Sequence, residues 1–322
     1  MRCGRCFRRC FLGEGQRGEC QAVSFNGNDI VIEGPRLSTL SVGPVEEKFV
    51  YHFRPGTSVL TAGFYNCNLR CSFCINHEIS QAQAEKPFVD SAELVSRAVV
   101  EGASGLAFSF SEPLLYAEYV RTAFEMAHVN GLYTILKTSG MMSKELFDLV
   151  LEETDACCVD IKGDPETYLI SCGATPKDVD LLFDNIESAK SLTNLELSLI
   201  VRPGRNKLES VLMDLSGAVG PLVPIHLVSF IPSFKEISSP ATLLSDMAEA
   251  RSLAQVYFDH VYDENPVSET ICRVCMKRLI RRDGGVLTYN VLEGNSCHCG
   301  EPLWKDKCAT ITNAQNARLS LK

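Results

Sequence analysis

Three cysteines stand close together in the sequence at Cys67, Cys71 and Cys74, with the spacing Cys-x3-Cys-x2-Cys. This spacing brings three thiolates together on one loop, whereas a cubane iron–sulfur cluster that is fully coordinated by protein has four cysteine ligands. Three ligands leave one iron open to a substrate or cofactor, as a catalytic zinc ion keeps one open position. The triplet therefore predicts a reactive iron–sulfur cluster. The alternatives are a zinc site completed by His77 and three unrelated buried cysteines.

Four cysteines near the end of the sequence are spaced almost as in a zinc ribbon: Cys272, Cys275, Cys297 and Cys299. Four protein ligands leave a zinc ion no open position, so this zinc would be structural. The second pair is one residue shorter than the usual Cys-x2-Cys, which makes His298 or Cys308 an alternative fourth ligand.

Four more cysteines lie within the first twenty residues and suffice for a further four-thiolate site: Cys3, Cys6, Cys10 and Cys20. Zinc and an auxiliary iron–sulfur cluster both suit this ligand set, and the spacing does not separate them. The chain has fifteen cysteines, an odd number, and is too long for a disulfide-stapled mini-domain. We therefore expect reduced, metal-binding cysteines.

Composition limits the partners of this 322-residue chain. Hydrophobic residues make up 45% and charged residues 22%, as in an ordinary globular protein. The 31 basic and 40 acidic residues give a net charge of −9, which argues against broad electrostatic binding to nucleic acid or anionic membranes. No run approaches the roughly 18 apolar residues of a membrane span, and no apolar secretory stretch follows Met1. The sequence predicts a soluble, cytoplasmic protein without nucleic-acid or membrane partners.

From residue 58 onwards, short apolar runs alternate with amphipathic stretches. Seven runs predict strands: Ser58–Phe64, Gly105–Phe110, Tyr133–Leu136, Ala156–Ile161, Leu195–Val201, Ile225–Phe230 and Val256–Val261. Capping residues indicate helix starts at Asp90-Ser91, Thr175-Pro176 and Ser239-Pro240. Strands alternating with helices indicate an α/β fold with a parallel sheet. About six repeats favour a full or partial barrel, with a doubly wound sheet as the alternative.

The predicted organisation has four parts. Residues 1–57 form a Cys-rich segment, residues 58–265 the barrel, residues 266–310 a zinc-ribbon-like module and residues 311–322 a tail. Residues 1–25 are too few to bury a core of their own, so bound metal or docking onto the barrel must order them. Residues 26–56 are expected to form a few short strands or an extended wrap. Ligands of parallel sheets bind beyond the carboxyl ends of the strands. Because the triplet follows the first barrel strand, we expect the active site there.

The triplet, with the aromatic residue Phe73 before its last cysteine, resembles the signature of radical SAM enzymes. The resemblance implies a partial (β/α)6 barrel and an open iron that binds the amino and carboxylate groups of S-adenosylmethionine (SAM). Reduction of the sulfonium would yield a 5′-deoxyadenosyl radical. Within the superfamily, the chain is similar to pyruvate formate-lyase-activating-like enzymes and in particular to AmmeMemoRadiSam-system enzymes. That likeness lies in the N-terminal cysteines, the turn Gly13-Glu14-Gly15-Gln16, the lead-in His52-Phe53-Arg54-Pro55-Gly56 and the stretch Ile75-Asn76-His77-Glu78-Ile79-Ser80.

The resemblance implies cofactor contacts at eight positions: Phe73, Ser111, Glu112, Thr138, Ser139, Asp160, Lys162 and Arg202. Lys162 would meet the SAM carboxylate, and Thr138 and Ser139 would contact the ribose. Glu112 belongs to the segment that contacts the SAM amino group.

Three further residues are candidates for a functional role, each with a structural role as the alternative. Cys172 could donate a hydrogen atom, although an ordinary buried thiol is the alternative. His226 matches a histidine of the family and is a catalytic candidate or a hydrogen-bonded core residue. His260 could be a ligand for a second cofactor, with a packing role as the alternative.

The resemblance predicts a radical SAM enzyme that abstracts a hydrogen atom from a peptide backbone Cα. A protein or peptide is then the substrate, and a ferredoxin or flavodoxin the electron donor. The product would be a glycyl radical on a partner enzyme or a carbon methylated with the help of cobalamin, as in enzymes that modify methyl-coenzyme M reductase. No cobalamin-binding Rossmann domain is evident, so cobalamin would bind near His260 or the ribbon. A different class of function is a zinc-ribbon binding module whose triplet also holds zinc.

Overall fold

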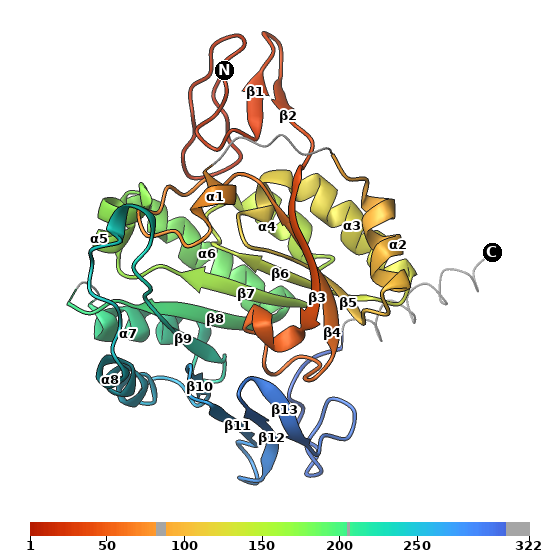
Figure 1. Cartoon of the computed structure of the whole chain (residues 1–322), viewed down its shortest axis with the longest axis vertical. Coiled ribbons are helices and arrows are strands. Elements are labelled where there is room, and N and C mark those ends of the chain that lie inside the picture. Colours follow the sequence, from red (N-terminus) through yellow and green to blue (C-terminus); the bar gives the residue numbers. More distant parts are fainter. Residues whose placement is uncertain (82–87, 205–206, 307–322) are drawn as a thin grey trace.

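The computed structural model describes residues 1–81, 88–204 and 207–306, which contain one eight-stranded sheet (Figure 1). The strand order is β10-β9-β8-β7-β6-β5-β4-β3, in which β4 to β10 run parallel and β3 runs antiparallel to β4. Their bounds are β3 (Leu37–Pro44), β4 (Ser58–Phe64), β5 (Gly105–Ser109), β6 (Tyr133–Thr138), β7 (Ala156–Ile161), β8 (Asn194–Val201), β9 (Ile225–Ser229) and β10 (Val261–Tyr262). The predicted α/β fold with a parallel sheet is confirmed.

Helices between successive parallel strands cover one face of the sheet (Figure 1): α2 (Ser91–Val100), α3 (Ala117–Val129), α4 (Lys144–Leu151), α6 (Pro176–Leu192), α7 (Leu208–Val219) and α8 (Leu244–Ala254). Shorter helical turns lie in the loops: η1 (Val45–Lys48), α1 (His77–Ser80), η2 (Pro113–Tyr116), α5 (Pro165–Thr167), η3 (Tyr168–Cys172) and η4 (Phe234–Glu236). The main hydrophobic core includes Phe64 and Phe108 of the sheet and Phe124 of α3. No helix in the described ranges has both the length and the apolar composition for crossing a bilayer.

Two of the three predicted helix starts are confirmed. The Asp90 carboxylate accepts a hydrogen bond from the Ala92 N–H at the start of α2, and Thr175 and Asp178 form a capping box at the start of α6. The start predicted at Ser239-Pro240 is wrong, because α8 begins only at Leu244.

The predicted strands match β4 to β9 within a few residues, whereas the seventh is mostly wrong. Residues 256–258 continue the end of α8 as turns, since the N–H groups of Val256, Tyr257 and Phe258 bond to the carbonyls of Leu253 or Ala254. Only Val261–Tyr262 form β10. Local hydrogen bonding thus takes up the apolar run that alternation alone assigns to a strand.

The other face of the sheet is partly filled by the segment that joins β3 to β4. Val45, Val50 and Phe53 pack against Val59 of β4 and Ile135 of β6 near the amino ends of these strands. The carboxyl half of this face therefore remains available for a cavity.

Small sheets lie outside the central one. β1 (Val23–Phe25) and β2 (Ile30–Ile32) form a hairpin in the N-terminal segment, and β11 (Val267–Ile271), β12 (Arg278–Asp283) and β13 (Val286–Asn290) form a sheet in the C-terminal one. The two segments lie at opposite ends of the molecule (Figure 1). The fully buried Arg282 fastens the C-terminal sheet to the β3–β4 connection, because its guanidinium lies 3.4 Å from Glu46 and 4.3 Å from the ring of Tyr51. The predicted tail at residues 311–322 lies outside the described residues.

Candidate active site

The cysteine triplet occupies the loop that leaves the carboxyl end of β4. Cys67, Cys71 and Cys74 all line one cavity of 340 Å³, a volume suited to an organic cofactor. Burial raises the pKa values of Cys67 and Cys74, and a hydrogen bond that the Cys71 thiol donates to Cys172, together with burial, raises that of Cys71. Such thiols ionise when a metal replaces the proton. Iron–sulfur ligation therefore fits this ligand set.

The alternative of a single zinc ion completed by His77 is not supported. Nδ1 of His77 lies 3.2 Å from the Cys74 carbonyl, and its ring stacks on Phe234. In the described ranges, the triplet and His77 do not belong to a group of ligand atoms that lie within 4.8 Å of one another. Ligands of a cubane bind different iron atoms and so need not approach this closely.

Lys162 and Asp160 lie where β7 ends and line the same cavity. Lys162 Nζ lies 3.3 Å from one oxygen of Asp160, and Lys137 Nζ lies 2.5 Å from the other. Although burial favours its neutral form, these two ammonium groups lower the pKa of Asp160 well below its usual range. Burial likewise opposes the charge of Lys162, but Asp160 and Cys71 raise its pKa. Lys162 thus stays positively charged in the cavity that the triplet lines, and this charge suits a ligand with a carboxylate group.

Glu112 positions the neighbouring strand end and does not line the cavity. It is fully buried, and its carboxylate accepts hydrogen bonds from Thr138 Oγ1 (2.7 Å), Ser139 Oγ (2.6 Å) and Ser139 N (3.0 Å). Burial raises the pKa of Glu112 despite these donors. Ser139 lines the cavity, whereas Thr138 lies behind it.

The turn after β5 adopts a strained conformation. Phe110 has a φ of 74°, in the left-handed region that a bulky residue rarely occupies. Asn76 Nδ2 donates a 2.8 Å hydrogen bond to the Phe110 carbonyl, and Ser111 Oγ donates one to Phe64. Phe110, Ser111 and Asn76 all line the cavity. Strain held by such contacts is common at functional sites.

Arg202 supports the cavity wall from behind. Its guanidinium lies 4.6 Å from the ring centres of both Phe73 and Phe230, and it forms an ion pair with Glu236. The two phenylalanines line the cavity, but Arg202 does not. Arg202, which was predicted to contact the cofactor, therefore acts on the cavity only through the two phenylalanines.

The three weaker candidates lie apart from the cavity lining. Cys172 is fully buried behind the triplet and hydrogen-bonds to Cys71. His226 is also buried, with Nε2 2.7 Å from Glu196. His260 lies beside a separate cavity of 160 Å³ near Cys272. The roles predicted for these residues, and cobalamin binding with them, stay predictions.

Two lysines that line the cavity, Lys48 and Lys137, are not among the residues predicted from the sequence. Lys137 is a charged residue inside the apolar strand β6, a signal that could have identified it. Lys48 precedes β4 by ten residues and is only 4% exposed; burial lowers its pKa. No sequence signal brings Lys48 to the cavity, because its position depends on the path of the β3–β4 connection.

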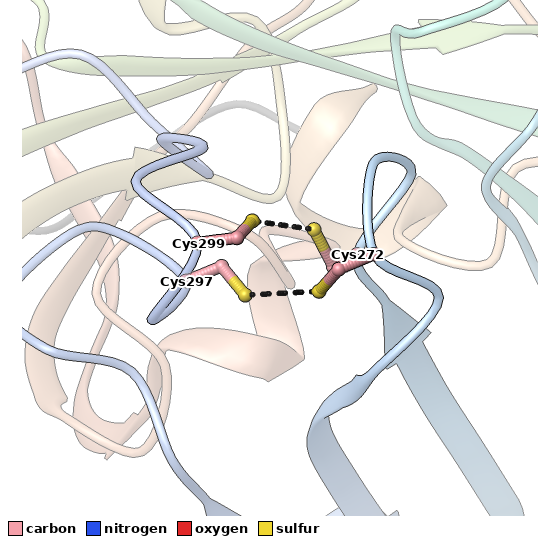
Figure 2. Close-up of side chains that lie close together, drawn as sticks. Cys272, Cys297 and Cys299 are labelled. Atoms are coloured by element: carbon pink, nitrogen blue, oxygen red, sulfur yellow. Dashed lines mark hydrogen bonds between the residues drawn. The ribbon is translucent and has the colours of Figure 1, made fainter.

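The C-terminal cysteines form a compact site at the tips of two loops. The four sulfur atoms of Cys272, Cys275, Cys297 and Cys299 lie within 4.8 Å of one another and could hold a metal ion. Figure 2 shows two sulfur–sulfur contacts across the site. The sulfur of Cys299 lies 3.7 Å from that of Cys272, and the sulfur of Cys297 lies 3.5 Å from that of Cys275. Cys299 thus occupies the fourth position despite the short spacing. His298 Nδ1 lies 3.2 Å from the Cys297 sulfur, and Cys308 lies outside the described residues.

Comparison with known proteins identifies the domain. Residues 63–213 match the Radical SAM superfamily. The uncharacterized protein MJ0808 of Methanocaldococcus jannaschii is 29% identical over 320 residues, which cover 94% of this chain and 95% of that protein.

Two activating enzymes match shorter regions. Pyruvate formate-lyase 1-activating enzyme of Escherichia coli K12 is 29% identical over 116 residues, covering 34% of this chain and 46% of that enzyme. The 4-hydroxyphenylacetate decarboxylase activating enzyme of Clostridioides difficile is 30% identical over 132 residues, covering 39% of this chain and 41% of that enzyme. The chain therefore aligns with less than half the length of either activating enzyme.

Solved structures resemble the chain at low sequence identity. A radical SAM methyltransferase from Sphaerobacter thermophilus has 13% identity, a TM-score of 0.49 and coverage of 66% of this chain and 67% of that one. QueE from Escherichia coli has 13% identity and a TM-score of 0.44, and the match covers 71% of this chain and 91% of that one. At TM-scores below 0.5, these likenesses have no bearing on the reaction. On the match over residues 63–213, which hold the triplet and Lys162, the chain has a radical SAM domain.

Proposed function

We propose that the chain reductively cleaves SAM at a [4Fe-4S] cluster and abstracts a hydrogen atom from the backbone Cα of a protein or peptide. The observation that carries the proposal is that Cys67, Cys71, Cys74 and Lys162 line one cavity. The cysteines would hold the cluster, which supplies the one-electron reduction of the sulfonium when bound. Lys162 would bind the SAM carboxylate through a charge-assisted hydrogen bond.

The rim of the cavity supports a peptide as the substrate. Ile75 and Ile231 line the cavity and are nevertheless 64% and 59% exposed. Exposed apolar side chains beside a cavity are typical of binding surfaces, and an extended peptide offers apolar side chains to such a rim. The names of the two activating enzymes describe proteins that act on other enzymes, which favours the same class of substrate here.

A deuterium-transfer experiment tests the class of substrate and does not require the substrate itself to be identified. The anaerobically reconstituted enzyme is incubated with SAM, a reductant and an extract of fully deuterated source cells, split into protein and small-molecule fractions. We expect deuterium in 5′-deoxyadenosine with the protein fraction, and loss of this transfer after proteolysis to free amino acids. Transfer from the small-molecule fraction alone would refute a protein substrate.

The fate of the substrate radical follows from mass spectrometry of the labelled protein. Cleavage of the polypeptide on exposure to air would identify a glycyl radical, as an activase produces. A mass increase of about 14 Da would identify methylation and would then call for a test of added cobalamin.

A further inference from the structure

The four N-terminal cysteines lie on two adjoining loops: Cys3, Cys6, Cys10 and Cys20. A 2.8 Å hydrogen bond from Cys3 N to Cys10 O closes the first loop, and a 2.9 Å bond from Gly18 N to Val23 O closes the second. Cys20 interacts electrostatically with Cys3 and Cys10, and Cys6 with Cys3 and Cys20. All four are free thiols, and Cys3, Cys6 and Cys20 are at most 8% exposed. Two adjoining loops therefore direct four sulfurs toward one region.

Backbone N–H groups point at these sulfurs. The N–H of Arg8 bonds to the sulfur of Cys6, and those of Ala22 and Val23 bond to the sulfur of Cys20. Burial raises the pKa of the Cys6 and Cys20 thiols, whereas these bonds act against the rise because they stabilise the thiolate. Bonds of this kind are the usual outer contacts of metal-bound sulfur. A cysteine buried for packing alone needs no such donors.

The same local geometry occurs at the other two cysteine sets of this chain. The N–H two residues further along the chain bonds to the sulfur at five of their cysteines: Cys67, Cys74, Cys272, Cys297 and Cys299. The N-terminal pairs Cys6–Arg8 and Cys20–Ala22 have this spacing too. The N-terminal set is therefore built like the two metal-ligand sets.

The closeness of the sulfur atoms distinguishes a site for a single metal ion from a site for a multi-iron cluster. Among the described residues, only the C-terminal four cysteines have ligand atoms that all lie within 4.8 Å of one another, the arrangement that one ion requires. Neither the N-terminal four cysteines nor the triplet forms a group whose ligand atoms all lie within this distance. Ligands of a multi-iron cluster bind different iron atoms and so stand further apart than ligands of one ion.

Asn68 connects the N-terminal cysteines to the triplet. This side chain is fully buried, hydrogen-bonds to the sulfur of Cys6 and lies 3.9 Å from the sulfur of Cys67 through its Oδ1. The Arg8 guanidinium donates to the Asn68 carbonyl, and that of Arg70 donates to the Glu19 carbonyl. We propose that Cys3, Cys6, Cys10 and Cys20 bind a second iron–sulfur cluster, separated from the SAM-binding site by Asn68.

The proposal is tested by iron and sulfide analysis of the full chain, reconstituted without air. We expect about eight iron atoms per wild-type chain and about four in a Cys6→Ser/Cys20→Ser variant. A Cys67→Ala/Cys71→Ala/Cys74→Ala variant should also keep about four. Cys157→Ala, which changes a buried cysteine of β7 away from all three sets, is the matched control and should keep the wild-type content.

Electron paramagnetic resonance provides a second readout that does not depend on turnover. The triplet variant should retain a reduced-cluster signal that SAM leaves unchanged, because four cysteines leave no open iron. The Cys6→Ser/Cys20→Ser variant should retain the signal that SAM shifts. A triplet variant without iron, or an N-terminal variant that loses zinc in place of iron, would overturn the proposal. Either result is independent of what the enzyme acts on.

Discussion

The ammonium group of Lys137 lies 2.5 Å from Oδ1 of Asp160, inside the sheet and at the wall of the cavity. The two residues face each other from adjacent strands, where Lys137 is paired with Cys158 and Asp160 follows two residues later. Lys137 thereby neutralises the carboxylate that also holds Lys162. The position of the lysine proposed to bind SAM depends on this partly buried pair.

Replacing Lys137 by methionine should destabilise the fold. The change leaves the partly buried Asp160, whose side chain is 25% exposed, with only Lys162 as its cation. The lost hydrogen bond between charged groups is worth about 1.5–3 kcal/mol. Urea unfolding of the anaerobic protein measures the loss. Lys144→Met, which removes an exposed ion pair with Asp148 in α4, should change stability by less than about 1 kcal/mol. Equal effects of the two substitutions would show that the pair of Lys137 and Asp160 contributes no more to stability than an exposed pair.

Replacing Cys71 by alanine should abolish SAM cleavage, because the cluster would lose one of its three ligands. Formation of 5′-deoxyadenosine in the presence of dithionite is measured by chromatography. Cys157→Ala again serves as the control, since Cys157 is buried in the sheet and does not line the cavity. Undiminished cleavage by Cys71→Ala would refute the assignment of the cluster.

Lys162→Met should weaken SAM binding by about 10- to 150-fold, which corresponds to the loss of a hydrogen bond to a charged group worth about 1.5–3 kcal/mol. Anaerobic equilibrium dialysis with labelled SAM gives the dissociation constant. Lys162→Arg keeps the charge and should recover part of the affinity. If Lys162→Met binds SAM as tightly as the wild type, the carboxylate is bound elsewhere.

The buried His226 should make the protein less stable in mild acid. Burial lowers its pKa, assisted by Lys137 and Arg282 and opposed by Glu196. The unfolded chain therefore takes up a proton below about pH 6.5 that the folded protein does not, so stability falls as the pH falls. His226→Gln should flatten the dependence of the unfolding free energy between pH 7.5 and 5.5, by up to about 1.4 kcal/mol per pH unit. Parallel curves for the two proteins would show that His226 does not contribute.

The C-terminal cysteines should hold one zinc ion. Cys299→Ser should lower the zinc content measured by mass spectrometry, because Cys299 completes the group of four sulfurs. His298→Ala removes the neighbouring imidazole and should retain the zinc. The reverse outcome would make His298 the fourth ligand.

The sequence alone determined the local features. The triplet spacing predicts the ligands of a cluster, and apolar runs between capping residues indicate β4 to β9 and the starts of α2 and α6. Both depend on interactions among residues close in the chain, which is why a single sequence reveals them. The spacing of Cys272, Cys275, Cys297 and Cys299 is likewise a local pattern that the sequence reveals.

The tertiary structure alone decided which polar residues face the cavity. Lys48 and Lys137 enter it, while Glu112 and Arg202 support it from behind. Neighbouring residues of a strand point to opposite faces, and only the packed helices fix which face is closed. The contact of Asn68 with both Cys6 and Cys67 joins segments some sixty residues apart. No local pattern encodes that contact, because it exists only once the N-terminal segment has docked on the barrel.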